Sequence, residues 1–469
     1  MSHHHAGHRV DPGSFLDVDT LTRWQQDLDA RGLRDTGSAA HHGYVADLER
    51  RMAAVGISGV QREEVPLRRW RARRWSLAVA GAEVETLSCV AYSGATPPGG
   101  TTGRLSATPA AGVIGLVDVP VLSVGAGEFD ALDWAPGGPP HPAGYDPTRR
   151  FERTWLSQDP MRDALDRFAA AGAAGLVLVV DQPGHVLRAP YLLYDGVHRG
   201  IPALFVSRAA GIRLHRALDA GLDARLVLEA EVDEVATPNL VGLIPGRSDE
   251  LVVLHSHTDG TNGIEDNGPE AILAMAHYLT RLPSHELPRS VLVLLSTGHF
   301  ASSQAWGVEA FLAAHRDDLG PRIAAAVTLE HLGARATGSG DAGHEFGCAF
   351  TSPHPALIDA TRRTLLRAAV TEARVVRPYL PGPGGHAPDP MTWPADGAPF
   401  WHTAGLPATN LITGPGYLFD AAPVMDHIDV DALRRQAIAF TELTLELAAM
   451  PWGVVRRRLV PGPAPVTSA

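Results

Sequence analysis

Imidazole and carboxylate side chains gather in one short stretch of this sequence, directly after an apolar run. The run Leu251–Leu254 leads into His257, and Asp259 and Asp266 follow on a glycine-containing loop. His257 and Asp266 have the chemistry to bind a divalent metal ion, most simply zinc. Asp259 lies two residues beyond His257 and is placed to orient its ring without binding the metal. The stretch therefore predicts a metal site with Asp259 as a supporting catalytic residue.

Two residues of this stretch have a structural alternative. His255 shares a strand face with His257, and we expect it to be a hydrogen-bonded core histidine rather than a ligand. Asp266 also suits the N-cap of a helix that begins near Pro269, because aspartate is a favoured N-cap and proline suits the first turn. Capping and metal binding are compatible roles for Asp266.

The elements that position these residues alternate along the second half of the chain. Strands are predicted at Leu251–His257, Ser290–Ser296, Ile323–Leu329 and Leu406–Thr413. Helices are predicted at about Pro269–Arg281, Ser303–His315, Pro355–Ala373 and Asp429–Ala449. Such alternation predicts an α/β fold with a largely parallel sheet covered by helices. Ligands of these sheets collect at the carboxyl ends of the strands, where His257 falls.

The rest of the chain divides into further parts. Residues 15–95 are predicted as the N-terminal part of the core, 96–236 as an inserted module, 237–450 as the catalytic-like core and 451–469 as a tail. Within the insertion, Gly125–Pro160 is rich in Pro and Gly, and a functional cover and a disordered loop both remain open for it. The arginine run Arg68–Arg74 is interpreted as a solvated strand edge and turn.

Composition restricts the partners and the setting. The net charge of −12 and the absence of a basic stripe argue against nucleic acid, and no apolar run is long enough to span a membrane. All 40 basic residues are arginine, which excludes lysine-based covalent catalysis. Two cysteines and the lack of an apolar leader predict a soluble cytoplasmic protein. The oligomeric state stays open, with a homo-oligomer as one possibility.

Several motifs together resemble the M28 family of zinc aminopeptidases, including members with an inserted protease-associated (PA) domain. Arg34–Ser38 is similar to the family's R-x-T-G-S opening, and residues 112–228 are similar to the PA module. His257–Asp259 and Asp266–Gly268 fit the H-x-D and D-N motifs. The resemblance implies a three-layer, mostly parallel or mixed sheet core of the zinc-exopeptidase type with an inserted β-rich PA domain.

The resemblance also implies which ligands are kept. The family holds two zinc ions bridged by one aspartate, which corresponds to Asp266 here. The first subsite adds His257 and a later acidic residue, for which this chain has Glu330. The family's Glu-Glu pair corresponds to Thr297–Phe300, which contains no acid, and its final histidine aligns with Phe419. The resemblance therefore predicts one zinc ion, bound by His257, Asp266 and Glu330.

The altered second subsite suggests new roles for its residues. His299 stands where the family has its general base, and histidine titrates close to neutral pH, so we predict His299 as the general acid or base. Phe300 and Phe419 are predicted to form an apolar wall against the substrate. His402 and Tyr417 are predicted as further substrate contacts.

Two classes of function follow from this pattern. The first is a mononuclear zinc hydrolase acting on a small amide or peptide-like substrate, with an acyl-transferring or cyclising enzyme as a variant. The second is a catalytically inactive, peptidase-like binding protein. The joint presence of His257, Asp259, Asp266 and Glu330 favours the enzyme, because an inactive scaffold has no need to keep them together.

Overall fold

The computed structural model describes most of the chain. The described residues are 10–134, 141, 145–181, 187–193, 195–301, 306–337, 343–382, 385–388, 393 and 395–456. Most of the predicted tail, the start of the predicted helix Ser303–His315 and parts of Gly125–Pro160 lie outside these ranges.

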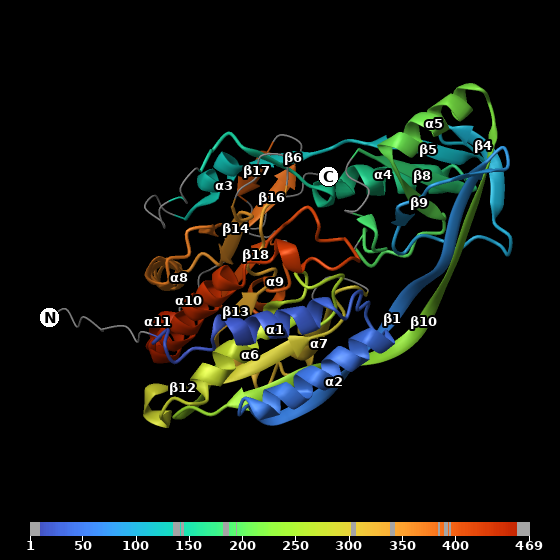
Figure 1. Ribbon diagram of the computed structural model, residues 1–469. Coiled ribbons are helices and arrows are strands. Elements are labelled where there is room, and N and C mark those ends of the chain that lie inside the picture. The colour runs from blue at the N-terminus through green and yellow to red at the C-terminus, as the bar shows by residue number, and fades with distance from the viewer. Residues whose placement is uncertain are drawn as a thin grey trace, which may run out of the picture.

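A mixed sheet forms the middle of the core (Figure 1). Its strands are β10 (Asp223–Ile244), β11 (Ser248–His257), β12 (Arg289–Ser296), β13 (Ile323–Leu329), β14 (Gly347–Thr351), β15 (Ala373–Val376) and β18 (Ala408–Thr413). Their order is β15-β14-β18-β13-β11-β12-β10, and β12, β11, β13 and β18 are parallel. The four strands predicted from the sequence are these four parallel strands, so the metal-site stretch does follow a central strand.

Helices cover both faces of this sheet. One face carries α1 (Val18–Asp29), α2 (Ala39–Ala54), α6 (Gly268–Leu279), α8 (Pro355–Arg367) and α10 (Val430–Ala449), with the short α11 (Trp452–Val455) beside α8. The other face carries α7 (Trp306–Ala314) and α9 (Ala398–His402). Along β11, Val252 and Leu254 belong to the first core while Leu251 and Val253 belong to the second. The predicted three-layer architecture is confirmed.

Helix α8 ends earlier than the sequence predicted. It stops at Arg367, because Ala369 adopts a left-handed backbone conformation (φ 53°) that ends the helix, and β15 begins at Ala373. The short strands β14 and β15 were not predicted, since four or five residues give little periodic signal.

The strands of the insertion are mostly parallel and continue the sheet of the core, because β10 also pairs antiparallel with the first of them along the sheet, β4 (Thr101–Ser106). The other strands are β5 (Ile114–Val119), β8 (Gly175–Val180) and β9 (Ala203–Ser207), with helices α4 (Gln158–Ala170) and α5 (Arg208–Asp219). The short strand β3 (Ser88–Cys89), which precedes the predicted boundary at residue 96, pairs with β9 at the end of the same group. Strands β4, β5, β8 and β9 run parallel, and β3 is antiparallel to β9. The insertion is therefore mixed α/β in content, and its assignment as a PA domain stays a prediction.

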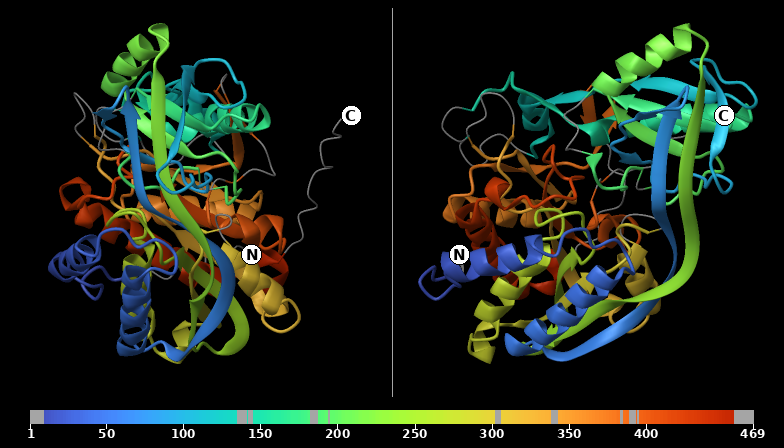
Figure 2. Two further views of the ribbon diagram at one scale, coloured as in Figure 1. Left: turned by 90° about the vertical axis from the view of Figure 1, so that its right-hand side faces the viewer. Right: turned by 45° about the vertical axis from the view of Figure 1, so that its right-hand side comes forward.

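Two long strands join the insertion to the core. Strand β1 (Ser58–Val79) pairs antiparallel with β10 along nearly its whole length, and both run from the core into the insertion (Figures 1 and 2). A short strand, β2 (Ala82–Val84), follows β1. The turn predicted within Arg68–Arg74 is wrong, because these residues continue β1. Their side chains pair with an acidic series on β10, for example Arg69 with Asp233, which makes the arginine run part of this strand pair.

Part of the Pro- and Gly-rich loop forms a cover on the core. It contains β6 (Ser123–Gly125), α3 (Ala126–Leu132) and β7 (Arg150–Glu152), next to the hairpin β16 (Tyr379–Gly382) and β17 (Gly385–Pro388). Phe129 stacks on Phe346 with ring centroids 4.7 Å apart, and Trp134 Nε1 donates to the carbonyl of Thr351 at 2.9 Å. These contacts favour the cover over the disordered alternative for the described part of the loop.

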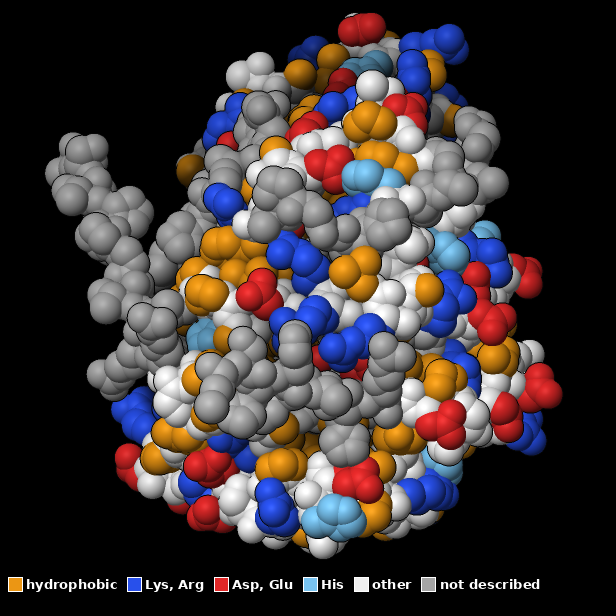
Figure 3. Space-filling model, turned by 90° about the vertical axis from the view of Figure 1, so that its left-hand side faces the viewer, with side chains coloured by type: hydrophobic (Ala, Val, Ile, Leu, Met, Phe, Trp, Pro, Cys, Tyr) orange, Lys and Arg blue, Asp and Glu red, His pale blue; other side chains and the backbone are white. Residues whose placement is uncertain are grey.

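The surface carries charges of both signs. On the face shown in Figure 3, basic and acidic side chains are intermixed. Among the described residues, no helix is long and apolar enough to cross a membrane.

We expect Leu254→Ala to lower the free energy of unfolding by about 2–5 kcal/mol, because Leu254 is fully buried in the centre of β11. Arg74→Gln is the control; its ion pair with Glu229 lies at the surface, and we expect a loss under about 1 kcal/mol. Urea unfolding followed by circular dichroism measures both. If both variants lost the same free energy of unfolding, the buried, central position of β11 would be contradicted.

Candidate metal centre

A buried ion pair fixes the loop that follows β11. Arg34 donates from Nε to Asp266 Oδ2 at 2.9 Å and also from Nη2 to Oδ1, and both side chains are fully buried. A methyl group on Gly260 would lie 2.5 Å from the Asp266 carboxyl carbon, so the loop needs glycine there. The carboxylate of Asp266, predicted as a metal ligand, is thus directed at Arg34. The N-cap of α6 is Asn267 rather than Asp266.

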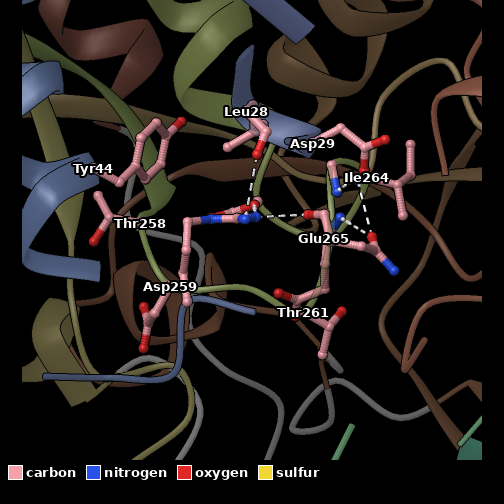
Figure 4. A network of polar contacts seen from close by, with 12 residues as sticks. Leu28, Asp29, Tyr44, Thr258, Asp259, Thr261, Ile264 and Glu265 are labelled. Atoms are coloured by element: carbon pink, nitrogen blue, oxygen red, sulfur yellow. Dashed lines mark hydrogen bonds and ion pairs between the residues drawn. The ribbon is translucent and has the colours of Figure 1, made fainter. Parts of the chain in front are cut away.

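Asp259 is held by the same N-terminal segment. Its Oδ2 accepts from the hydroxyl of Thr36 and from the backbone N–H of Phe300, the latter at 3.1 Å. The Asp259 backbone carbonyl accepts from His257 Nδ1 at 2.9 Å. The contact of Asp259 with His257 is therefore made by its backbone carbonyl, while its carboxylate is bound by Thr36 and Phe300. Figure 4 shows the polar network of this loop, with Asp259 and Glu265 labelled.

His257, Glu330 and His331 form one group with the spacing of metal ligands; their ligand atoms lie within 4.8 Å of one another. The Nδ1 of His331 donates to the carbonyl of Thr413 at 2.6 Å. A carbonyl can only accept, so Nδ1 carries a proton in both histidines and Nε2 is the ring nitrogen left for a metal ion. Burial disfavours charge on His257, but the carboxylates of Glu265, Asp396 and Glu330 outweigh it and raise the pKa of His257, and a bound metal ion would displace the Nε2 proton. Both Nε2 atoms and Glu330 Oε2 are buried without a hydrogen-bond partner. The sequence interpretation had not assigned His331.

A second group shares His257 and adds Glu265 and His299. His299 Nδ1 lies 2.9 Å from Asp396 Oδ1, and its Nε2 lies 3.0 Å from Glu265 Oε1. The angles of the Glu265 contact are poor for a hydrogen bond, so it is better described as an ion pair. Glu265 was not predicted from the sequence, yet it occupies the position beside His257 and His299 that was expected for Asp266. The only signal for it in the sequence is that it directly precedes the D-N motif.

The pKa values of these buried groups move in opposite directions. Burial lowers the pKa of His331 to about 4 and raises that of Glu330 to about 7. Burial also disfavours charge on His299, but Asp396 and Glu265 outweigh it and raise the pKa of His299 well above its usual value. Burial raises the pKa of Glu265, but His299, His257 and His331 together outweigh it and lower that pKa below its usual value. Without a metal ion, His331 is neutral while His299 and Glu265 form a charged pair.

His255 lies next to this cluster but is satisfied within the core. Its Nδ1 lies 3.1 Å from Thr328 Oγ1 and its Nε2 lies 2.8 Å from Ser296 Oγ. Burial lowers its pKa to about 3. The expectation of a hydrogen-bonded core histidine is confirmed.

A cavity of about 100 Å³ opens on the cluster. Its lining includes His299, Glu330 and His331 together with many aromatic side chains, namely Phe129, Phe151, Trp155, Tyr191, Phe346, Phe350, Tyr379 and Phe419. The first four of these aromatic residues come from the insertion. Arg153 of the insertion also lines the cavity and pairs with Glu345 at 2.5 Å. The site therefore lies between core and insertion, which the sequence interpretation did not foresee.

Of the four residues predicted to contact the substrate, one lines the cavity. Phe419 lines the cavity, and Phe300 packs behind Tyr191 beside a separate hollow. Tyr417 does not line the cavity; its hydroxyl donates to backbone carbonyls, including that of His427 at 3.0 Å. His402 also does not line it and lies on α9 beside Trp393.

Comparison with known proteins identifies the fold. No protein-family model and no curated protein match the sequence. A zinc aminopeptidase from Bacillus subtilis has a TM-score of 0.64 at 17% identity, covering 92% of this chain and 94% of that chain. An aminopeptidase from Aneurinibacillus sp. strain AM-1 has a TM-score of 0.61 at 15% identity, covering 93% and 96%. A peptidase M28 precursor from Shewanella amazonensis has a TM-score of 0.60 at 16% identity, covering 92% and 97%. The predicted resemblance to M28 zinc aminopeptidases is confirmed for the fold.

We expect Arg34→Leu to lower the free energy of unfolding by about 3–5 kcal/mol, because it leaves the buried Asp266 carboxylate without its partner. Arg34→Leu combined with Asp266→Leu removes both charges and is expected to lose less than the single variant. Thermal and urea unfolding measure the difference. A double variant that is less stable than Arg34→Leu would contradict the importance of this pair.

Proposed function

We propose that this protein is a zinc-dependent amide hydrolase that binds one zinc ion through His257, Glu330 and His331. One observation carries the proposal: two imidazoles and a carboxylate direct buried ligand atoms toward one another, and none of these atoms has a hydrogen-bond partner. Buried polar atoms without partners are costly unless an ion or ligand satisfies them. Two histidines and one carboxylate are a known ligand set for catalytic zinc, in which a fourth position stays open.

The contacts of the candidate ligands support the binding of one zinc ion rather than two. Both candidate ligand groups use His257, and its single available Nε2 can bind one ion at a time. In the second group, His299 is already engaged by Asp396 through Nδ1 and by Glu265 and Tyr191 at Nε2. Asp266, the ligand expected from the sequence, is occupied by Arg34. The proposed ligands therefore differ from those expected from the sequence in one residue, with His331 in place of Asp266.

Glu265 and His299 are suited to move the protons of amide hydrolysis. Bound zinc would polarise the substrate carbonyl and lower the pKa of a water molecule. Glu265, an ionised carboxylate, accepts a proton as the water oxygen bonds to the carbonyl carbon. His299 donates its Nε2 proton to the nitrogen as the carbon–nitrogen bond breaks. Glu265 Oε1 lies 3.0 Å from His299 Nε2, so after the amine leaves, a small change in the angle of this contact lets the proton pass from Glu265 to His299 and restores both groups.

The cavity supports a substrate with a large apolar group. Its aromatic lining removes apolar surface from water without offering partners to a charged side chain. The only charged pair that lines it outside the cluster, among the described residues, is Arg153 with Glu345, which form an ion pair with each other. We therefore propose a peptide-like amide whose acyl side carries an aromatic or branched aliphatic side chain.

Elemental analysis of protein purified without chelator is expected to give close to one zinc per chain. His257→Ala and His331→Ala should each remove it, because each deletes a ligand. His285→Ala is the matched control, since His285 is exposed and distant from the ligand group. Protein that holds no zinc even after incubation with the ion would exclude the proposal, and a reproducible value near two would exclude the one-ion site.

The activity is tested with a panel of aminoacyl 4-nitroanilides and the zinc-loaded protein. Anilides with a large apolar side chain should give a kcat/KM on the order of 10- to 100-fold above those with a charged one. His299→Gln should retain zinc and lower kcat on the order of 10²–10⁴-fold, because the acid is lost. His215→Gln, at the surface of the insertion, is its control. Absence of turnover with bound zinc would favour the binding-protein alternative.

A further inference from the structure

A segment of the insertion reaches into the metal centre. Arg188 makes a bidentate pair with Asp420, with Nε at 2.7 Å from Oδ1 and Nη2 at 2.8 Å from Oδ2. The backbone N–H of Ala189 donates to the carbonyl of Phe419 at 3.0 Å. Segment 187–193 is therefore fastened to the core loop after β18, and it brings Tyr191 to His299.

Two phenylalanines hold the ring of Tyr191. The ring centroid of Phe300 lies 4.1 Å from that of Tyr191, and the ring centroid of Phe419 lies 4.8 Å away. Tyr191 is only 2% exposed, so its ring has little room to turn. The two phenylalanines that were expected to form an apolar wall against the substrate therefore also pack against Tyr191 and hold its ring in place.

The hydroxyl of Tyr191 forms a hydrogen bond with Nε2 of His299. Asp396 holds the other ring nitrogen, so the imidazole is fixed at both ends. Glu265 approaches the same Nε2 but at an angle unsuited to a hydrogen bond. Tyr191 is thus the better-aligned partner of the nitrogen that would deliver the proton. Tyr191 also lines the cavity, so Nε2 is held at its wall.

We propose that Tyr191 is a positioning residue for His299, supplied to the reaction centre by the insertion. The proposal rests on the proposed function, in which His299 is the acid. Removing the hydroxyl leaves Nε2 with the ion pair to Glu265 alone, and the ring then follows that carboxylate away from the leaving nitrogen. The insertion therefore takes part in the chemistry as well as in enclosing the substrate.

The contact itself is tested by NMR on protein labelled with ¹⁵N-histidine, without need of a substrate. His299→Gln identifies the His299 signals by their loss. Tyr191→Phe should shift the Nε2 resonance of His299, whereas Tyr278→Phe, which removes a hydroxyl that accepts from the backbone of Asp11, should not. Arg188→Gln releases the segment and should produce the same shift, which serves if Tyr191→Phe fails to fold. An unchanged His299 resonance overturns the proposal.

Kinetics separate positioning from a purely structural role. On the best anilide of the panel, Tyr191→Phe should lower kcat by about 10- to 100-fold with KM changed less than about twofold, since a partner of a catalytic group is lost while the substrate cavity is kept. Unchanged kcat, or a change in KM alone, overturns the proposal while the hydrolase function stands. If the wild type hydrolyses none of the anilides, the proposed function fails and the NMR shift alone decides on Tyr191.

Discussion

The arrangement of the candidate metal centre depends on the buried ion pair between Arg34 and Asp266. Neither side chain reaches solvent, so each charge relies on the other and on neighbouring polar groups. Arg34 also donates to the carbonyl of Asn262 at 2.7 Å, and nearby Thr36 holds Asp259. The connection between α1 and α2 thereby fixes the whole loop after β11. That loop in turn orients His257 and presents Glu265, so the N-terminal segment determines the geometry of a site to which it contributes no candidate ligand.

The same loop shows where prediction from the sequence succeeds and where it stops. The periodic apolar pattern predicted β11 and β13, and with them the positions of His257 and Glu330 at strand ends. Within the loop no such periodicity exists, and adjacent residues can face opposite ways. Asp266 turns to Arg34 and Glu265 turns to His299, a difference of one residue that the D-N motif does not reveal. Loop contacts are set by the folded surroundings rather than by the local pattern.

Long-range packing explains the other residues that the sequence did not indicate. His331 points its Nε2 into the centre because its backbone adopts a left-handed conformation (φ 53°) and its Nδ1 meets the carbonyl of Thr413. Tyr191 belongs to the insertion and meets His299 across more than a hundred positions of sequence. The centre combines these elements into a cluster of buried ionisable groups, only some of which satisfy one another. Such a cluster is expected at a functional site, because a purely structural core would be more stable with apolar side chains.

The pairing of β1 with β10 determines how the insertion is connected to the core. Its two ends enter and leave through adjacent strands, so in topological terms the entire insertion is the loop of one very long hairpin. The entropy needed to close a loop rises only with the logarithm of its length, so a large insertion costs little more to close than a small one. The hydrogen bonds between β1 and β10, together with their arginine–carboxylate pairs, offset this loss of entropy. A module of this size can therefore be accommodated in the chain, or change in length, without altering the register of the core strands.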